Sequence, residues 1–192
     1  GSLYFSDPQY LMPPEDRLIG TSSVFRIDPE GGLHQAGTDM NHPNGLAFSP
    51  DESLLYVSNT RPDPHMYAYE VADDGSLSNG RVFAEMPYVP AGPGEGDTFT
   101  NHSGAERPIG ERGGVPDGLK VDIAGRVFST GPGGCWVWEP SGELLGVIET
   151  PELPANVGWG GADFKTLYLT SRTSVYSLRV KTAGTPIPGM PG

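Results

Sequence analysis

Two short turns in this chain carry oxygen donors of the kind that bind hard metal ions. Asn44 lies between Pro43 and Gly45, and Asp117 has the same place in residues 116–118, Pro-Asp-Gly. An amide oxygen and a carboxylate that converge on one point suit calcium or magnesium, and a bound cation can polarise a carbonyl group. Pro-Asn-Gly and Pro-Asp-Gly are also ordinary turn sequences. The residues alone therefore leave two interpretations open, a metal site and a pair of structural turns.

A recurring tetrapeptide indicates which elements would position these turns. Each copy ends in Ser or Thr, and each is followed by a second short run that carries an aromatic residue. Three of those second runs lead into an acidic turn that contains Gly, which is typical of β-hairpins. A further short strand precedes three of the copies, and two of these strands directly follow Asn44 and Asp117. The four copies are Leu3-Tyr4-Phe5-Ser6, Leu55-Tyr56-Val57-Ser58, Val127-Phe128-Ser129-Thr130 and Leu167-Tyr168-Leu169-Thr170.

Four short strands in a repeat of roughly 40 residues are typical of a β-propeller blade. The pattern predicts an all-β chain of fourteen strands with few helices, in four units of three, four, four and three strands. About three and a half blades leave exposed edge strands, so we expect one partial propeller domain over residues 1–192, the C-terminal part of a larger propeller. Its predicted parts are an incomplete blade (1–40), a blade (41–86), a loop insert (87–115), a blade (116–150), an incomplete blade (151–180) and a tail (181–192).

The composition excludes several classes of partner. Asp and Glu outnumber Lys and Arg by 24 to 12, which gives a net charge of −12. Such a chain offers no basic surface for nucleic acid or for an anionic membrane. No apolar run approaches the roughly 20 residues that span a bilayer. With Cys135 as its one cysteine, the chain forms no internal disulfide and no Cys-rich metal site. We expect Cys135 to be a small buried residue in a strand.

Four motifs in the chain occur in the same order in a known family. Residues 43–51 read Pro-Asn-Gly-Leu-Ala-Phe-Ser-Pro-Asp, and residues 116–122 read Pro-Asp-Gly-Leu-Lys-Val-Asp. Residues 3–8 read Leu-Tyr-Phe-Ser-Asp-Pro, and residues 156–161 read Asn-Val-Gly-Trp-Gly-Gly. In register, these motifs resemble the SMP-30/gluconolactonase/LRE-like family. The resemblance covers most of the chain apart from residues 87–115.

The resemblance implies a six-bladed propeller in the intact family, with one divalent cation in its central channel. The cation is usually calcium, with zinc, magnesium or manganese as alternatives. Family members hydrolyse lactones such as gluconolactone. By this resemblance Asn44 and Asp117 would be metal ligands, and Asp117 would also be the catalytic base or nucleophile. The family's further ligands, a Glu in the first blade and an Asn before the third blade's inner strand, would lie upstream of Gly1.

Three further residues are candidates for binding a small lactone-type substrate: Trp159, Asn156 and His42. The other histidines show no metal-ligand spacing, and we expect them to be scattered over the surface. Because one fold hosts many functions, two alternatives stay open: a non-enzymatic binding platform and a phosphotriester (organophosphate) hydrolase. The sequence leaves the oligomeric state and the compartment open, and we expect export to the periplasm or the medium only if a signal segment precedes Gly1.

Overall fold

The computed structural model describes residues 1–9, 12–17, 19–60, 64–86 and 113–186. They form fourteen strands and one short 3₁₀ helix, in four antiparallel sheets. The elements are β1 (Leu3–Asp7), η1 (Pro14–Asp16), β2 (Ser23–Ile27), β3 (Leu33–Gly37), β4 (Pro43–Phe48), β5 (Leu54–Asn59), β6 (His65–Val71), β7 (Leu77–Glu85), β8 (Leu119–Val121), β9 (Val127–Gly131), β10 (Gly134–Trp138), β11 (Leu144–Glu149), β12 (Pro154–Gly160), β13 (Thr166–Ser171) and β14 (Val175–Arg179).

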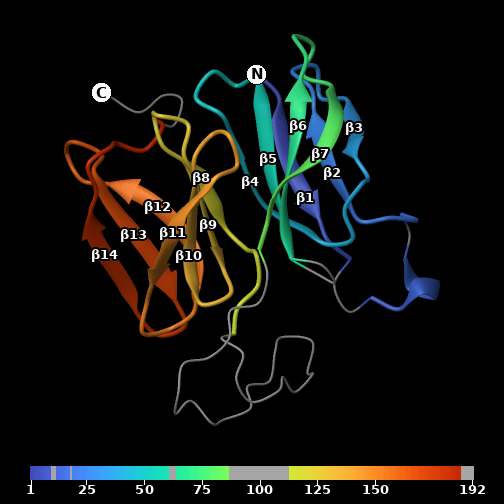
Figure 1. Cartoon of the computed structure of the whole chain (residues 1–192). Coiled ribbons are helices and arrows are strands. Elements are labelled where there is room, and N and C mark those ends of the chain that lie inside the picture. The colour runs from blue at the N-terminus through green and yellow to red at the C-terminus, as the bar shows by residue number, and fades with distance from the viewer. Residues whose placement is uncertain (10–11, 18, 61–63, 87–112, 187–192) are drawn as a thin grey trace.

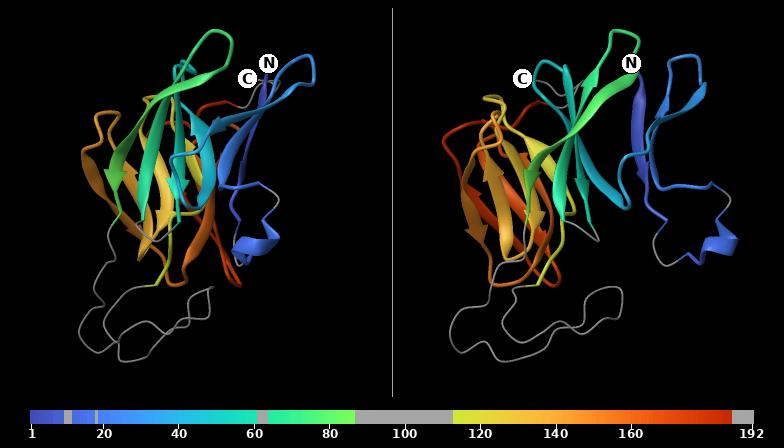
Figure 2. Two further views of the ribbon diagram at one scale, coloured as in Figure 1. Left: turned by 90° about the vertical axis from the view of Figure 1, so that its right-hand side faces the viewer. Right: turned by 45° about the vertical axis from the view of Figure 1, so that its right-hand side comes forward.

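The sheets stand side by side in chain order, from β1–β3 at one side to β12–β14 at the other (Figures 1 and 2). They have three, four, four and three strands, paired in the order of the chain. The first strands of neighbouring sheets contact each other, β1 with β4, β4 with β8 and β8 with β12. The predicted all-β propeller fold is confirmed. The division of the chain into one partial domain with an inserted loop stays a prediction, and most of that loop lies outside the described residues.

Three apolar clusters hold the sheets together, one at each junction between neighbours. Successive side chains of a strand point to opposite faces. In β5, Leu55 and Val57 therefore pack toward the first sheet, and Tyr56 packs toward the third sheet with Leu119 and Trp138. All five side chains are nearly or fully buried. This alternation explains why the tetrapeptide in β5 is apolar at adjacent positions, because both faces of its strand are covered. In the outer sheets one face is open, and Phe5 and Tyr168 are exposed.

The Ser or Thr at the end of the first three copies of the tetrapeptide joins each sheet to the next one. The Ser6 hydroxyl donates to the Asn44 carbonyl at 2.7 Å, and the Ser58 hydroxyl donates to the Asp117 carbonyl at the same distance. The Thr130 hydroxyl makes the equivalent bond to the Ala155 carbonyl at 3.1 Å. The recurring hydroxyl therefore fixes the start of β4, the turn before β8 and the start of β12 against the preceding sheet.

The segment that follows β14, as far as residue 186, pairs with the third sheet. Thr185 donates its backbone N–H to the Val121 carbonyl at 3.1 Å, and Gly184 bridges Asp122. Asp122 is buried and forms an ion pair with Arg126 at 2.8 Å. The segment thus ties the end of β8 to the last sheet.

Two smaller expectations can be compared with the described residues. Cys135 is fully buried in β10, and burial raises the pKa of its thiol to about 12, which confirms a packing role. In the described part of the chain, no helix has the length and apolarity needed to cross a membrane.

Candidate functional site: a corner between two sheets

The structure brings Asn44 and Asp117 together. Asn44 is the second residue of β4, and Asp117 lies two residues before β8 in the next sheet. Both residues are half-buried, and a hydrogen bond joins their side chains. Since the amide nitrogen is the only donor on either side chain at neutral pH, Asn44 donates and the Asp117 carboxylate accepts. The two residues that the sequence selected as ligands therefore form one corner.

The backbone of this corner is fixed by close contact between the sheets. Gly45 donates its N–H to the Asp117 carbonyl at 3.2 Å, and Gly118 makes the same bond to the Ala155 carbonyl at 3.0 Å. A Cβ atom on Gly45 would overlap the Asp117 carbonyl oxygen. Glycine is therefore required after Asn44, because it allows the two strands to approach closely enough for their side chains to meet.

Asp117 has an electrostatic environment that suits a cation. Burial raises the pKa of its carboxyl group, and the hydrogen bond from Asn44 only partly opposes that rise. Within the described ranges, no Lys, Arg or His forms an ion pair with this carboxylate. A desolvated carboxylate and an amide oxygen are the donor types that calcium prefers. The residues present therefore fit a divalent cation as part of its ligand set.

A buried threonine, not selected from the sequence, connects the two halves of the corner. Thr60 is fully buried and follows β5. Its hydroxyl accepts a hydrogen bond from Asn44 Nδ2 at 3.2 Å and donates to the Pro116 carbonyl at 2.9 Å. Thr60 lies two residues after Ser58, so its side chain points to the same face of the strand, toward the third sheet. That spacing is the signal that could have identified it.

The third corner repeats the backbone arrangement with different side chains. Ala155 takes the place of Asn44 and Asp117, and the exposed Asn156 takes the place of the glycine that follows them. The Asn156 Oδ1 accepts a hydrogen bond from the N–H of Val157 at 2.8 Å. It also lies where a Cβ atom on Gly118 would be, directly beside the Asp117 corner. Asn156 is therefore a neighbour of the Asn44–Asp117 pair.

The two remaining candidates occupy different places. His42 precedes β4, where its N–H donates to Asn59 Oδ1 at 2.9 Å and its carbonyl accepts from Thr60 N–H at 2.9 Å. The Trp159 ring makes an edge contact with Phe128, with 4.8 Å between the ring centroids. His42 is thus held at the corner end of β4, whereas Trp159 lies further along β12 and packs with the core. Their predicted substrate roles stay predictions.

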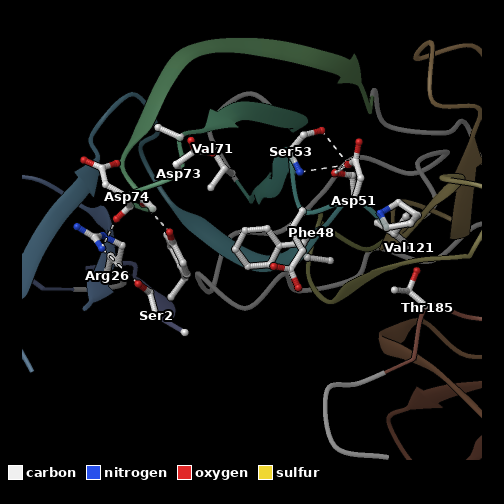
Figure 3. Close-up of a pocket in the computed structure, with 18 of the residues that line it drawn as sticks. Ser2, Arg26, Phe48, Asp51, Ser53, Val71, Asp73, Asp74, Val121 and Thr185 are labelled. Atoms are coloured by element: carbon white, nitrogen blue, oxygen red, sulfur yellow. Dashed lines mark hydrogen bonds between the residues drawn. The ribbon is translucent and has the colours of Figure 1, made fainter. Parts of the chain in front are cut away.

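The opposite end of the same strands opens into a cavity of about 1340 Å³ (Figure 3). Its acidic side chains are held in turns: Asp51 accepts from the hydroxyls of Ser49 and Ser53, and these bonds lower the pKa of its carboxyl group to about 2. The buried Arg26 donates to the Asp74 carbonyl at 2.8 Å. Over the residues that the structure describes, no three His, Cys, Asp or Glu side chains are grouped to hold a metal ion.

Known proteins share both the sequence and the fold. The SMP-30/gluconolactonase/LRE-like region matches residues 1–173. A gluconolactonase of Zymomonas mobilis is 32% identical over 190 residues, which cover 96% of this chain and 49% of that protein. A solved gluconolactonase structure from Xanthomonas campestris has a TM-score of 0.71 and 31% identity, with 93% of this chain and 53% of that chain covered. The chain spans about half the length of the curated relatives it matches.

A more distant structure shares the fold alone. Regucalcin from Agrobacterium tumefaciens has a TM-score of 0.63 at 16% identity, with 85% of this chain and 54% of that chain covered. The four antiparallel sheets define a propeller chain in which the Asn44 amide and the Asp117 carboxylate meet between two sheets. Together with the match over residues 1–173, they show that the chain belongs to the SMP-30/gluconolactonase/LRE-like family.

Proposed function

We propose that this protein is a metal-dependent lactonase that opens a sugar lactone or a related lactone ring at the corner formed by Asn44 and Asp117. The observation that carries the proposal is the desolvated Asp117 carboxylate, which is hydrogen-bonded to the Asn44 side chain from the neighbouring sheet. Membership of the family and the similarity to gluconolactonases support the same chemistry.

Asn44 and Asp117 would hold the cation through the amide oxygen and the carboxylate. Calcium suits this pair best, because it takes about six to eight oxygen ligands at flexible angles. Magnesium and manganese also accept oxygen donors, while zinc favours nitrogen and sulfur. When bound, the cation supplies a Lewis acid that polarises the lactone carbonyl group.

Asp117 would then act as the general base. Its carboxylate takes a proton from a water molecule as the water oxygen attacks the lactone carbonyl carbon. The bond between that carbon and the ring oxygen breaks, and the proton passes to the ring oxygen, so the product is a hydroxy acid. Asn44 donates to the Asp117 carboxylate and holds it in place for this transfer.

The test is the rate of gluconolactone hydrolysis above the uncatalysed rate. We expect activity with calcium, loss of activity with a chelator, and recovery when calcium is added back. Asp117→Ala should lose the calcium-dependent rate. Undiminished hydrolysis by Asp117→Ala would contradict the assignment of this residue.

Calcium-dependent cleavage of a phosphotriester but not of a lactone would indicate an organophosphate hydrolase. Calcium binding with neither activity would indicate a binding platform.

A single turnover in oxygen-18-labelled water separates the two roles that Asp117 could have. If Asp117 is the base, the label enters the hydroxy acid directly, and the peptide that contains Asp117 stays unlabelled. If Asp117 attacks the carbonyl carbon itself, it forms a mixed anhydride with the substrate, and attack of labelled water on the Asp117 carbon of that anhydride leaves label in its own carboxyl group. Mass spectrometry of that peptide distinguishes the outcomes, and a labelled Asp117 would contradict the general-base step.

A further inference from the structure

We propose that Thr60 is a positioning residue for the cation site, which orients the Asn44 side-chain amide so that its oxygen faces the cation. This inference rests on the proposed function, because it assigns a partner to one of the proposed ligands. Thr60 directly follows β5 of the second sheet, which also holds Asn44, and it reaches the turn that carries Asp117 before the third sheet.

The argument begins with the single proton of the Thr60 hydroxyl group. A hydroxyl donates one hydrogen bond and can accept two. The Pro116 carbonyl can only accept, so the bond of 2.9 Å between them uses the Thr60 proton. Toward Asn44 the Thr60 oxygen is therefore an acceptor. Asn44 must face it with Nδ2, at 3.2 Å, and not with Oδ1.

This orientation matters because an amide has two chemically opposite ends. The nitrogen carries two N–H donors, and in this corner they serve Thr60 and the Asp117 carboxylate. The oxygen is the atom that a calcium ion binds. If the amide rotated by half a turn, it would present N–H groups to the cation and an oxygen to the Asp117 carboxylate. Thr60 disfavours that rotation, because its own proton is already committed to Pro116.

The burial of Thr60 makes this control effective. The Thr60 side chain is fully buried, so water cannot take over its hydrogen bonds when the hydroxyl is removed. Its backbone is fixed as well, since the N–H donates to the His42 carbonyl at 2.9 Å. Groups that hold a metal ligand in this way typically change metal affinity by about 10- to 100-fold when they are removed. We expect the same range for Thr60.

The experiment is calcium titration by calorimetry of the wild-type chain, Thr60→Val, Thr60→Ser and Asn44→Ala. Thr60→Val keeps the shape and removes the hydroxyl, so we expect calcium affinity to fall by about 10- to 100-fold. Thr60→Ser keeps the hydroxyl and should restore the affinity to near the wild-type value. Thr130→Val is the matched control, because it removes another buried hydroxyl between sheets, which donates to the backbone carbonyls of Gly118 and Ala155 and bonds to no proposed ligand side chain. It should keep the wild-type affinity.

The outcomes separate the two levels of the proposal. Loss of binding in Asn44→Ala with wild-type affinity in Thr60→Val would overturn the role of Thr60 and leave the proposed site intact. An equal loss in Thr60→Val and Thr130→Val would also overturn it, because general destabilisation would then be the cause. Wild-type affinity in Asn44→Ala would instead contradict the proposed site.

A measurement without metal tests the orientation itself. In nitrogen-15-labelled protein, the two Asn44 side-chain N–H protons should exchange with solvent more slowly in the wild type than in Thr60→Val, because Thr60 holds the amide. Equal exchange rates in the two proteins would overturn the inference. This result applies even if the chain takes up no calcium, in which case the proposed function fails separately.

Discussion

The two ends of the inner strands place aspartates in opposite environments. At the corner end, Asp117 is desolvated and its side chain bonds to Asn44, so its pKa is raised. At the cavity end, Asp51 is accessible to water and accepts hydrogen bonds from Ser49 and Ser53, so its pKa falls to about 2. The difference shows that the position of an aspartate in a turn does not determine the pKa of its carboxyl group, which depends on burial and on hydrogen-bond partners. The turn around Asp51 stabilises its carboxylate, whereas burial of Asp117 disfavours the charged form of its carboxyl group.

A second contrast is between the corner of Asn44 and Asp117 and the corner of Ala155, which share the same backbone arrangement but carry different side chains. The backbone bond from Gly45 to Asp117 and the backbone bond from Gly118 to Ala155 follow the same pattern, yet only the first lies beside two residues that we propose as ligands. The hydrogen-bonded framework is therefore common to the blades. The corners differ in the one residue that each framework presents.

The largest expected effect comes from replacing the two aspartates in parallel. Asp117→Asn removes the base and keeps the shape, so kcat/KM for gluconolactone should fall by about 10²- to 10⁴-fold. Asp51→Asn alters a turn at the other end and should keep kcat/KM close to the wild-type value. An equal loss in both variants would remove the distinction between the two ends.

Gly45→Ala tests whether the close contact at the corner is required. The added Cβ atom would meet the Asp117 carbonyl oxygen, which is a backbone atom and cannot move aside easily. We expect a loss of about 1–3 kcal/mol in the free energy of unfolding, measured with urea. Gly158→Ala is the control on another inner strand, because no atom lies within 4 Å of its Cβ position. A similar loss of unfolding free energy in Gly45→Ala and Gly158→Ala would show that the contact at this corner is no closer than elsewhere.

Two serines test the same contrast with a smaller effect. The Ser58 hydroxyl is buried and donates across the sheets to the Asp117 carbonyl at 2.7 Å. Ser58→Ala should lower the free energy of unfolding by about 1 kcal/mol. Ser53 is exposed and donates to Asp51 within its own turn, so Ser53→Ala should cost less. The reverse ranking would show that the hydroxyl between the sheets is not a structural link.

The pH dependence of stability should have opposite signs for the two aspartates. The folded-state pKa of Asp117 lies above its ordinary value of 3.8, so the stability it gives is greatest below that value and is lost as the pH rises through the folded-state pKa. Asp51 has a folded-state pKa of about 2, so its contribution is present above 3.8 and is lost as the pH falls through about 2. We therefore expect urea unfolding across this range to give two opposite trends. Relative to the wild type, the free energy of unfolding of Asp117→Asn should rise toward neutral pH, and that of Asp51→Asn should fall. Parallel curves would contradict the contrast.

The local sequence pattern predicted most of the fold. The tetrapeptides fall in β1, β5, β9 and β13, because an apolar alternation and the turns after it are short-range signals. The strand ends were less predictable. The run at residues 80–84 lies within the longer β7, and the run at residues 156–159 lies within the longer β12. These extensions depend on pairing with neighbouring strands, which the pattern of one segment does not contain.

The proximity of the two candidate ligands was predictable in part for the same reason. Asn44 and Asp117 were found because each sits in a recognisable turn before a strand. Thr60 was missed, since its importance comes from bonds to residues 16 and 56 positions away along the chain. The packing of Trp159 against Phe128 and the pairing of Thr185 with Val121 were also not predicted. Each is a contact between segments that are distant in the sequence.

The most direct test of the central claim is a crystal structure of the protein grown or soaked with calcium. We predict a calcium ion bound by the Asn44 side-chain oxygen and the Asp117 carboxylate at about 2.3–2.6 Å, with the Asn44 nitrogen still facing Thr60. Calcium bound at Asp51 or Asp74 in the opposite cavity, with the corner left without a cation, would contradict the account.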